Sequence, residues 1–160
     1  GNRNLHQEDK DLRANAIYWP YHAAIDNEIK RFAELGVEPV FVSIHSFAPV
    51  MNGDSRTWEM GVLWDKDRLT AELFINGLRE AGYLVGDNEP YSGKAPQDFT
   101  IDQHAETIGL PHVGIEIRQD LILRADGVQR IAEVMHSIVD AVPAQINPTD
   151  IASRQPPRSA

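Results

Sequence analysis

The stretch Pro39-Val-Phe-Val-Ser-Ile-His-Ser-Phe47 decides the fold class of this chain. It is rich in β-branched residues, which predicts a strand, and it is too apolar for an exposed edge of a sheet. A second stretch, His112-Val-Gly-Ile-Glu-Ile-Arg118, predicts another strand. Helical patterns surround both stretches. Strands that alternate with helices predict an α/β fold with three layers (α/β/α), in which a mostly parallel mixed sheet lies between helices.

The other segments predict further helices, short strands and loops. Apolar residues recur at helical spacing from Asp9 to Leu35, with Pro20 as the expected kink and Gly36 as the expected stop. The other expected elements are loops over 49–58 and 87–93, strands over 60–64 and 83–86, and helices over 67–81, 101–108 and 127–142. Residues 143–160 contain Pro and Ser and are expected to form a mobile tail.

Composition and charge exclude several classes of function. The chain has 160 residues, of which 42% are hydrophobic, and this is enough for a buried core. Its formal net charge of −9 argues against nucleic acid as a partner, because phosphate binding needs clustered Lys and Arg. The absence of cysteine excludes disulfides, thiol catalysis and cysteine-bound zinc, so any metal must be held by His and carboxylate side chains. No segment resembles a membrane span or a signal peptide, and we therefore expect a soluble, cytoplasmic protein.

Both long strands end in polar residues, and chemistry in α/β sheets collects where strands end. Alternation places Ser43, His45 and Phe47 on one face of the first strand, and it places Glu116, Arg118 and Asp120 on one face of the second. Burial of a carboxylate is costly unless it is paired or works at a site. The residues alone therefore allow a hydrolytic His/Glu/Arg site at the sheet edge. They equally allow a structural Glu116–Arg118 pair and a hydrogen-bonded core histidine at position 45.

Two loops and one helix add further candidates. Arg56 lies beside Trp58 in a loop and is suited to bidentate capture of a carboxylate. Asn88 and Tyr91 offer an amide and a phenol on a turn that contains proline. Ordinary surface-loop chemistry is the alternative for all of these residues. His104 is compatible with support of a site and with exposure to solvent. The sequence contains no glycine-rich phosphate loop, no His-Glu-x-x-His motif and no nucleophile elbow.

Several motifs together resemble the N-formylglutamate amidohydrolase family, and they occur in that family's order and at its approximate spacing. The resemblance runs from Gly1 to about Ala141, and the family is similar in fold to zinc carboxypeptidases and aspartoacylases, a phosphorylase/hydrolase-like, zinc-peptidase-like fold. The motifs are Ser43-Ile-His-Ser-Phe-Ala-Pro-Val50, Arg56-Thr-Trp58, Gly61-Val-Leu-Trp64, Gly86-Asp-Asn-Glu-Pro-Tyr-Ser92 and Glu116-Ile-Arg-Gln-Asp-Leu-Ile122.

The resemblance implies an activity and a set of site residues. His45 matches a histidine that binds zinc, the single divalent metal of the site. Glu116 matches the glutamate that activates water and carries a proton to the leaving amine. The implied reaction converts N-formyl-L-glutamate, a small-molecule substrate, and water into formate and L-glutamate, late in histidine breakdown. Arg56, Arg118, Asn88 and Tyr91 are expected to hold the substrate's carboxylates and the developing oxyanion.

The chain departs from the family pattern at its start. Members of the family open with a strand and loop that carry two further zinc ligands, and nothing from Gly1 to Leu35 matches that opening. Residues 1–142 are therefore expected to form the larger, C-terminal part of a single amidohydrolase domain, with the other two ligands upstream. The alternatives are an amidohydrolase for another N-acyl amino acid and a non-catalytic α/β binding module that lacks the metal site. The oligomeric state stays open.

Overall fold

The computed structural model describes residues 2–94 and 99–145, which fall into two compact units, residues 1–39 and residues 40–160. Most of the tail predicted over 143–160 lies outside the described residues, and residues 143–145 continue a helix, so the prediction is wrong for them. Every helix within the described ranges is too short or too polar to serve as a membrane span.

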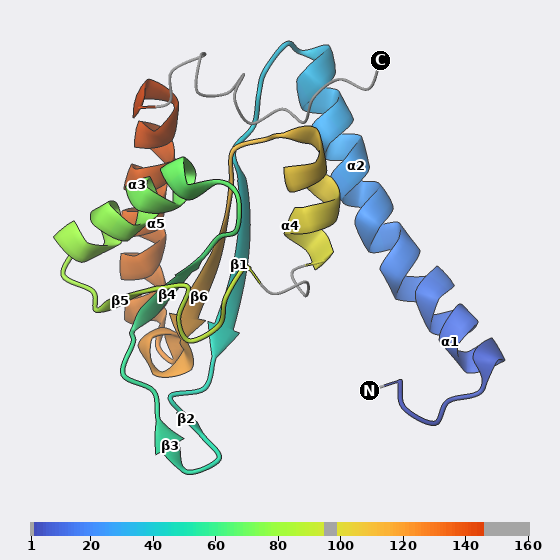
Figure 1. Cartoon of the computed structure of the whole chain (residues 1–160), viewed down its shortest axis with the longest axis horizontal. Coiled ribbons are helices and arrows are strands. Elements are labelled where there is room, and N and C mark those ends of the chain that lie inside the picture. The colour runs from blue at the N-terminus through green and yellow to red at the C-terminus, as the bar shows by residue number, and fades with distance from the viewer. Residues whose placement is uncertain (1, 95–98, 146–160) are drawn as a thin grey trace. The chain divides into compact units, whose positions relative to one another are not determined.

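The first unit is one long helical run. It consists of α1 (Gln7–Arg13), a π-helical turn (Ala14–Tyr18) and α2 (Trp19–Glu34) (Figure 1). The wide turn ends two residues before Pro20, whose missing N–H and ring do not fit a regular helix interior. The run ends at Gly36, which has a positive φ of 68°. The predicted helix, its irregularity near Pro20 and its stop at Gly36 are confirmed.

A four-stranded mixed sheet forms the centre of the second unit. Its strands occur in the order β1-β6-β4-β5. The pairs β1–β6 and β4–β5 are parallel, and β4–β6 is antiparallel, which confirms the predicted mostly parallel mixed sheet. The strand bounds are Phe41–Phe47 for β1, Met60–Leu63 for β4, Val85–Asp87 for β5 and His112–Arg118 for β6.

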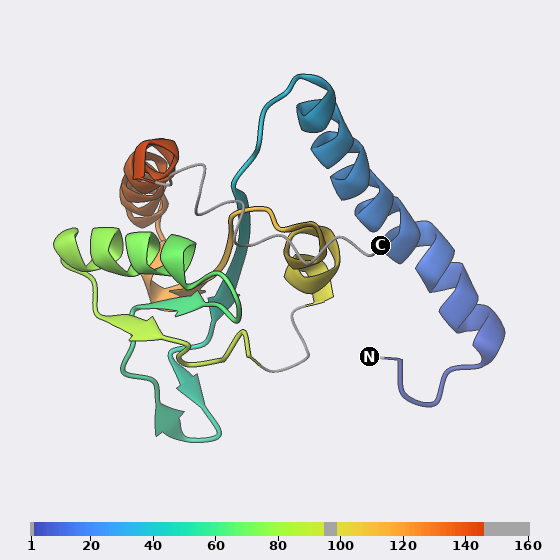
Figure 2. The same cartoon turned by 45° about the horizontal axis from the view of Figure 1, so that its top comes forward.

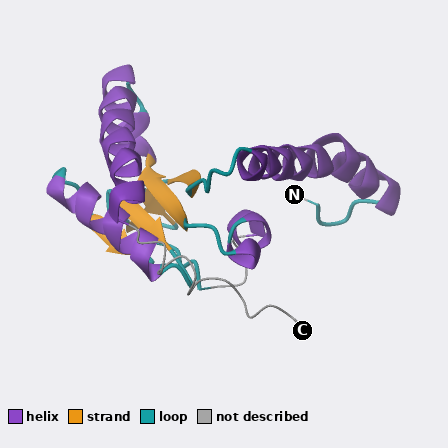
Figure 3. Ribbon diagram, turned by 90° about the horizontal axis from the view of Figure 1, so that it is seen from above, coloured by secondary structure: helices purple, strands orange, loops and turns teal. Residues whose placement is uncertain are grey.

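Helices flank both faces of this sheet, as predicted (Figures 2 and 3). On one face lie α3 (Arg68–Glu80) and α5 (Ala125–Gln145), which contact each other. On the other face α4 (Phe99–His104) contacts β1 and β6. The helix predicted over 101–108 is divided, because α4 ends at His104 and a 3₁₀ turn follows over Glu106–Ile108.

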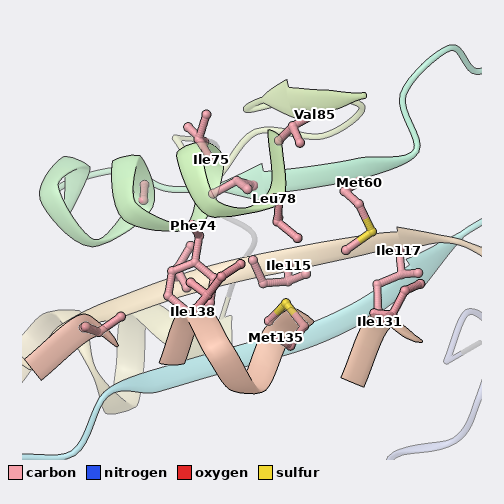
Figure 4. Close-up of a cluster of buried hydrophobic side chains, with 14 residues drawn as sticks. Met60, Phe74, Ile75, Leu78, Val85, Ile115, Ile117, Ile131, Met135 and Ile138 are labelled. Carbon is pink, nitrogen blue, oxygen red and sulfur yellow. The ribbon is translucent and has the colours of Figure 1, made fainter. Parts of the chain in front are cut away.

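The hydrophobic core lies between the sheet and the α3–α5 pair (Figure 4). The apolar residues on α3 and α5 recur at helical spacing, so each helix presents one apolar stripe to the sheet. Odd-numbered residues of β6 point to the same side, and Ile115 is fully buried there. The buried side chains include Met60, Phe74, Ile75, Leu78, Val85, Ile117, Ile131, Met135 and Ile138.

A polar junction ties the start of α3 to the start of β6. The Asp67 carboxylate caps α3 by accepting a hydrogen bond from the Thr70 backbone N–H at 3.1 Å. Its second oxygen accepts from the His112 backbone N–H at 2.9 Å. Beside it, Lys66 forms an ion pair with Glu106, and this hydrogen bond raises the pKa of Lys66. One helix cap therefore also fixes where the central strand begins.

Two features of the second unit differ from the sequence prediction. The predicted loop over 49–58 contains a small hairpin of β2 (Val50–Met51) and β3 (Asp54–Ser55). Positive φ values at Asn52 and Gly53 make its tight turn, which is the conformation that an Asn-Gly pair favours. The prediction that β1 is too apolar for an edge is wrong for the described sheet, because no described strand pairs with its outer side and Ile44 is 58% exposed.

Leu78→Ala tests the core. Leu78 is fully buried, so we expect the substitution to lower the free energy of unfolding by about 2–5 kcal/mol, because a cavity remains in the core. Leu123→Ala is the matched control, since Leu123 is 78% exposed and should change stability by less than about 0.5 kcal/mol. Urea denaturation measures both. Equal effects of the two substitutions would contradict the proposed core.

Candidate functional site

The register between β1 and β6 brings His45 and Glu116 together. The two strands are parallel, and the Cα of His45 is paired with that of Glu116. Paired residues of neighbouring strands point to the same side of a sheet, so both side chains lie on the face opposite the α3–α5 core. Two residues further along both strands, on the same face, Phe47 is paired with Arg118. The structure therefore unites the two polar strand ends that the sequence singled out.

Glu116 is buried at 7% exposure, in a part of the face where side chains are small. Its other neighbour in the sheet is Gly61 on β4, which is itself paired with Gly86 on β5. A Cβ at Gly61 would lie 2.3 Å from the Glu89 carbonyl oxygen and 3.2 Å from the Cβ of Glu116. The two glycines thus let the backbone at Glu89 pack directly on the sheet beside Glu116.

His45 is exposed, which contradicts the alternative of a core histidine. Its Nε2 lies 2.9 Å from the Ser43 hydroxyl oxygen, two residues earlier on the same strand face. A hydrogen bond to one ring nitrogen orients the imidazole and leaves Nδ1 for another ligand. The arrangement presents an oriented imidazole next to a buried carboxylate.

Arg56 and Tyr91 are 35 residues apart in the chain but lie in contact. Arg56 Nη1 donates a hydrogen bond to the Tyr91 hydroxyl oxygen at 2.8 Å. The same guanidinium lies 4.9 Å from the centroid of the Tyr91 ring and 5.6 Å from that of Phe47. Because Phe47 follows His45 by two residues on β1, these contacts place Arg56 next to the carboxyl end of the strand that carries His45.

Asn88 organises the loop that carries Tyr91. Its side-chain oxygen accepts hydrogen bonds from the backbone N–H groups of Trp64 at 3.0 Å and of Gly93 at 2.9 Å. Its own φ is 55°, a left-handed conformation that Asn tolerates better than most residues. The Asn88 backbone N–H also donates to the Val62 carbonyl oxygen at 2.9 Å, which ties the loop to β4.

Arg118 forms a bidentate pair with Asp120, whereas the sequence had allowed a structural pair with Glu116. Its Nε donates to Asp120 Oδ1 at 2.7 Å and its Nη2 donates to Oδ2 at 3.1 Å. Nη1 donates to the backbone carbonyl oxygens of Thr57 and Trp58, both at 3.2 Å. The hydrogen bond between the two side chains lowers the pKa of Asp120 and raises that of Arg118.

Two further histidines are buried in this unit. His104 on α4 is 2% exposed, which excludes the solvent-facing alternative. His112, at the start of β6, donates from Nδ1 to the Leu110 carbonyl oxygen at 2.7 Å, and its Nε2 lies 3.8 Å from a Glu106 oxygen. One sequence signal points to His112, namely its place at the start of a strongly apolar strand, and no pattern locates Glu106 beside it.

His45 supplies one imidazole, whereas catalytic zinc usually has three protein ligands. Within residues 2–94 and 99–145, no three His, Asp or Glu side chains gather closely enough to hold a metal ion. The described residues therefore do not complete a zinc site by themselves.

Comparisons with known proteins give consistent results. Residues 2–123 match the N-formylglutamate amidohydrolase family. A gene product of Agrobacterium tumefaciens of known structure is 33% identical, with a TM-score of 0.82 over 89% of this chain and 57% of its own. N-formylglutamate amidohydrolase from Ralstonia eutropha is 21% identical, with a TM-score of 0.66 over 91% of this chain and 58% of its own, and shows the shared fold. The chain thus spans less than two thirds of both structures. No curated protein matches significantly.

Gly61→Ala tests the packing beside Glu116. The new methyl group would overlap the Glu89 backbone, so we expect a loss of about 1–3 kcal/mol in the free energy of unfolding. Asn76→Ala is the control, because Asn76 is exposed on α3 and its substitution should change stability by less than about 0.5 kcal/mol. Urea denaturation measures both, and a Gly61→Ala variant as stable as the wild type would contradict the close approach.

Proposed function

Because the chain belongs to the N-formylglutamate amidohydrolase family, a family of hydrolases, we propose that it carries the proton-transfer and substrate-binding residues of a zinc-dependent amidohydrolase. The proposed reaction converts N-formyl-L-glutamate and water into formate and L-glutamate, late in histidine breakdown. The observation that carries the proposal is the pairing of His45 with Glu116 on one face of the sheet.

Glu116 is proposed as the general base. Its carboxylate accepts a proton from the attacking water and then transfers that proton to the amide nitrogen that leaves as the amine of glutamate. General acid–base catalysis of this kind typically contributes about 10²–10⁴-fold to the rate. Burial of the carboxylate supports the role, because it excludes bulk water from the group that moves the proton.

His45 is proposed as one of the zinc ligands, through Nδ1, since Ser43 is bonded to Nε2. When bound, zinc supplies Lewis-acid chemistry, lowering the pKa of water toward about 7 and polarising the amide carbonyl. The remaining ligands would come from outside the described residues.

Arg56 and Tyr91 are proposed to bind the anionic part of the substrate. The chain as a whole repels anions, because its net charge is −9, so a local cation is needed at the site. Arg56 offers a guanidinium held by the Tyr91 hydroxyl and by two aromatic rings. Asn88 supports this pair by shaping the loop that carries Tyr91.

Two alternatives remain. The substrate is another N-acyl amino acid if the residues around Arg56 select a different side chain. A non-catalytic binding module is favoured by a single observation, namely that the described residues lack a complete metal site. Formate release and zinc content distinguish the alternatives from the proposed enzyme.

Glu116→Gln tests the general base in the complete gene product that contains this chain. We expect turnover of N-formyl-L-glutamate to fall by about 10²-fold or more, because Gln cannot accept the proton, while the zinc content is unchanged. Glu133→Gln is the control, since Glu133 is exposed on α5 and should leave the rate unaltered. A near-normal rate in Glu116→Gln would show that Glu116 is not the general base. Absence of formate release by the wild type would overturn the proposed function.

His45→Ala tests the metal ligand without an activity assay. We expect the zinc bound after dialysis, measured by mass spectrometry of the metal, to fall to background, because the site loses one of its ligands. His136→Ala on the exposed side of α5 should keep the full zinc content. Equal zinc in the two variants would show that His45 is not a ligand.

A further inference from the structure

The guanidinium of Arg118 is already occupied by protein groups. A guanidinium has five N–H donors, and four hydrogen bonds from Arg118 go to the Asp120 carboxylate and to the backbone carbonyls of Thr57 and Trp58. The edge formed by Nε and Nη2 is taken by Asp120. Bidentate capture of another carboxylate needs such an edge, with two parallel donors.

The two carbonyl groups that Arg118 holds come directly after Arg56 in the chain. The Arg118 backbone N–H also donates to the Glu59 carbonyl oxygen at 3.0 Å, one residue beyond Trp58. Arg118 therefore fixes the backbone over 57–59 from the end of β6. This is the segment that joins Arg56 to β4.

The two arginines differ in whether a charged partner compensates the guanidinium. Arg118 is neutralised by a charge-assisted, bidentate bond to Asp120, and its side chain is 17% exposed. The partners of Arg56 among the described residues are the Tyr91 hydroxyl, the Met51 sulfur and aromatic rings, none of which carries a charge. Arg56 thus keeps a positive charge that a substrate carboxylate can compensate.

We propose that Asp120 and Arg118 form a positioning pair that fixes Arg56, and that Arg56, not Arg118, binds the substrate carboxylate. Asp120 orients the Arg118 fork, and Arg118 holds the backbone next to Arg56. This inference rests on the proposed function for the identity of the substrate, but the hydrogen-bonded pair itself does not depend on that function.

Asp120→Asn separates the two roles of Arg118, assayed in the complete gene product with N-formyl-L-glutamate. If Arg118 positions Arg56, the substitution loosens the segment and raises KM by on the order of 10-fold, because Arg56 then holds the substrate carboxylate less well in the ground state and the transition state alike. The kcat should change by less than about threefold, because Glu116 is held by its paired strands. If Arg118 instead binds the substrate, removal of the competing carboxylate frees two donors and lowers KM, which would overturn the proposal.

Two variants control this experiment. Asp126→Asn removes an ion pair of the same spacing, Arg124–Asp126, whose side chains are 83% and 63% exposed, and it should leave KM and kcat unchanged. Asp120→Glu retains the carboxylate, so its KM should lie between that of the wild type and that of Asp120→Asn. Thermal unfolding of each variant confirms that it is folded. An equal KM in Asp120→Asn and Asp126→Asn would also overturn the proposal.

Limited trypsin digestion gives a readout that is independent of activity. Cleavage after Arg56 requires the segment over 57–59 to open, so Asp120→Asn should be cut there faster than the wild type, relative to cleavage after the exposed Arg124. An unchanged cleavage ratio would contradict the positioning pair. If the wild type releases no formate, the proposed function fails, whereas the digestion still decides whether Asp120 and Arg118 hold this segment.

Discussion

The parallel pairing of β1 with β6 is the constraint on which the rest of the candidate site depends. Side chains alternate along a strand, so a slip of one residue would move His45 to the core face and separate it from Glu116. The register is fixed from the other side of the sheet, where Ile115 and Ile117 pack into the α3–α5 core. It is also fixed at the start of β6, where the His112 backbone is bonded to the α3 cap. Packing on one face therefore determines which polar groups meet on the other.

The loops around this pair are held by hydrogen bonds to backbone groups and by close packing of backbone on the sheet. Glycines at positions 61 and 86 let the backbone at Glu89 lie on the sheet, and Asn88 closes the turn that follows β5. Arg118, at the end of β6, holds the segment that follows Arg56. Each of the two loops is thus anchored to a strand that also carries or adjoins Glu116. Such anchoring holds the groups of these loops in position for chemistry.

Much of the fold could be predicted from the sequence, because apolar periodicity records which face of each element is buried. The strands over 41–47 and 112–118 and the helix over 68–80 follow this rule. The juxtaposition of His45 and Glu116 could also be predicted, since both lie near the ends of strands. The partner of Arg118 could not, because spacing alone places both Glu116 and Asp120 two residues away. The Asn52-Gly53 pair is a sequence signal for a hairpin turn, but the surrounding Pro- and Gly-rich stretch favoured the prediction of a loop. The contact between Arg56 and Tyr91 had none, since it depends on how two distant loops fold back on the sheet.

We propose that this sheet face joins a metal-binding imidazole to a catalytic carboxylate. The most direct measurement is anomalous diffraction at the zinc absorption edge, from crystals of the complete gene product grown with zinc. We expect a zinc peak about 2.0–2.1 Å from a ring nitrogen of His45, with the Glu116 carboxylate on the same face but not bonded to the metal. A zinc peak remote from His45, or one bonded directly to Glu116, would contradict it.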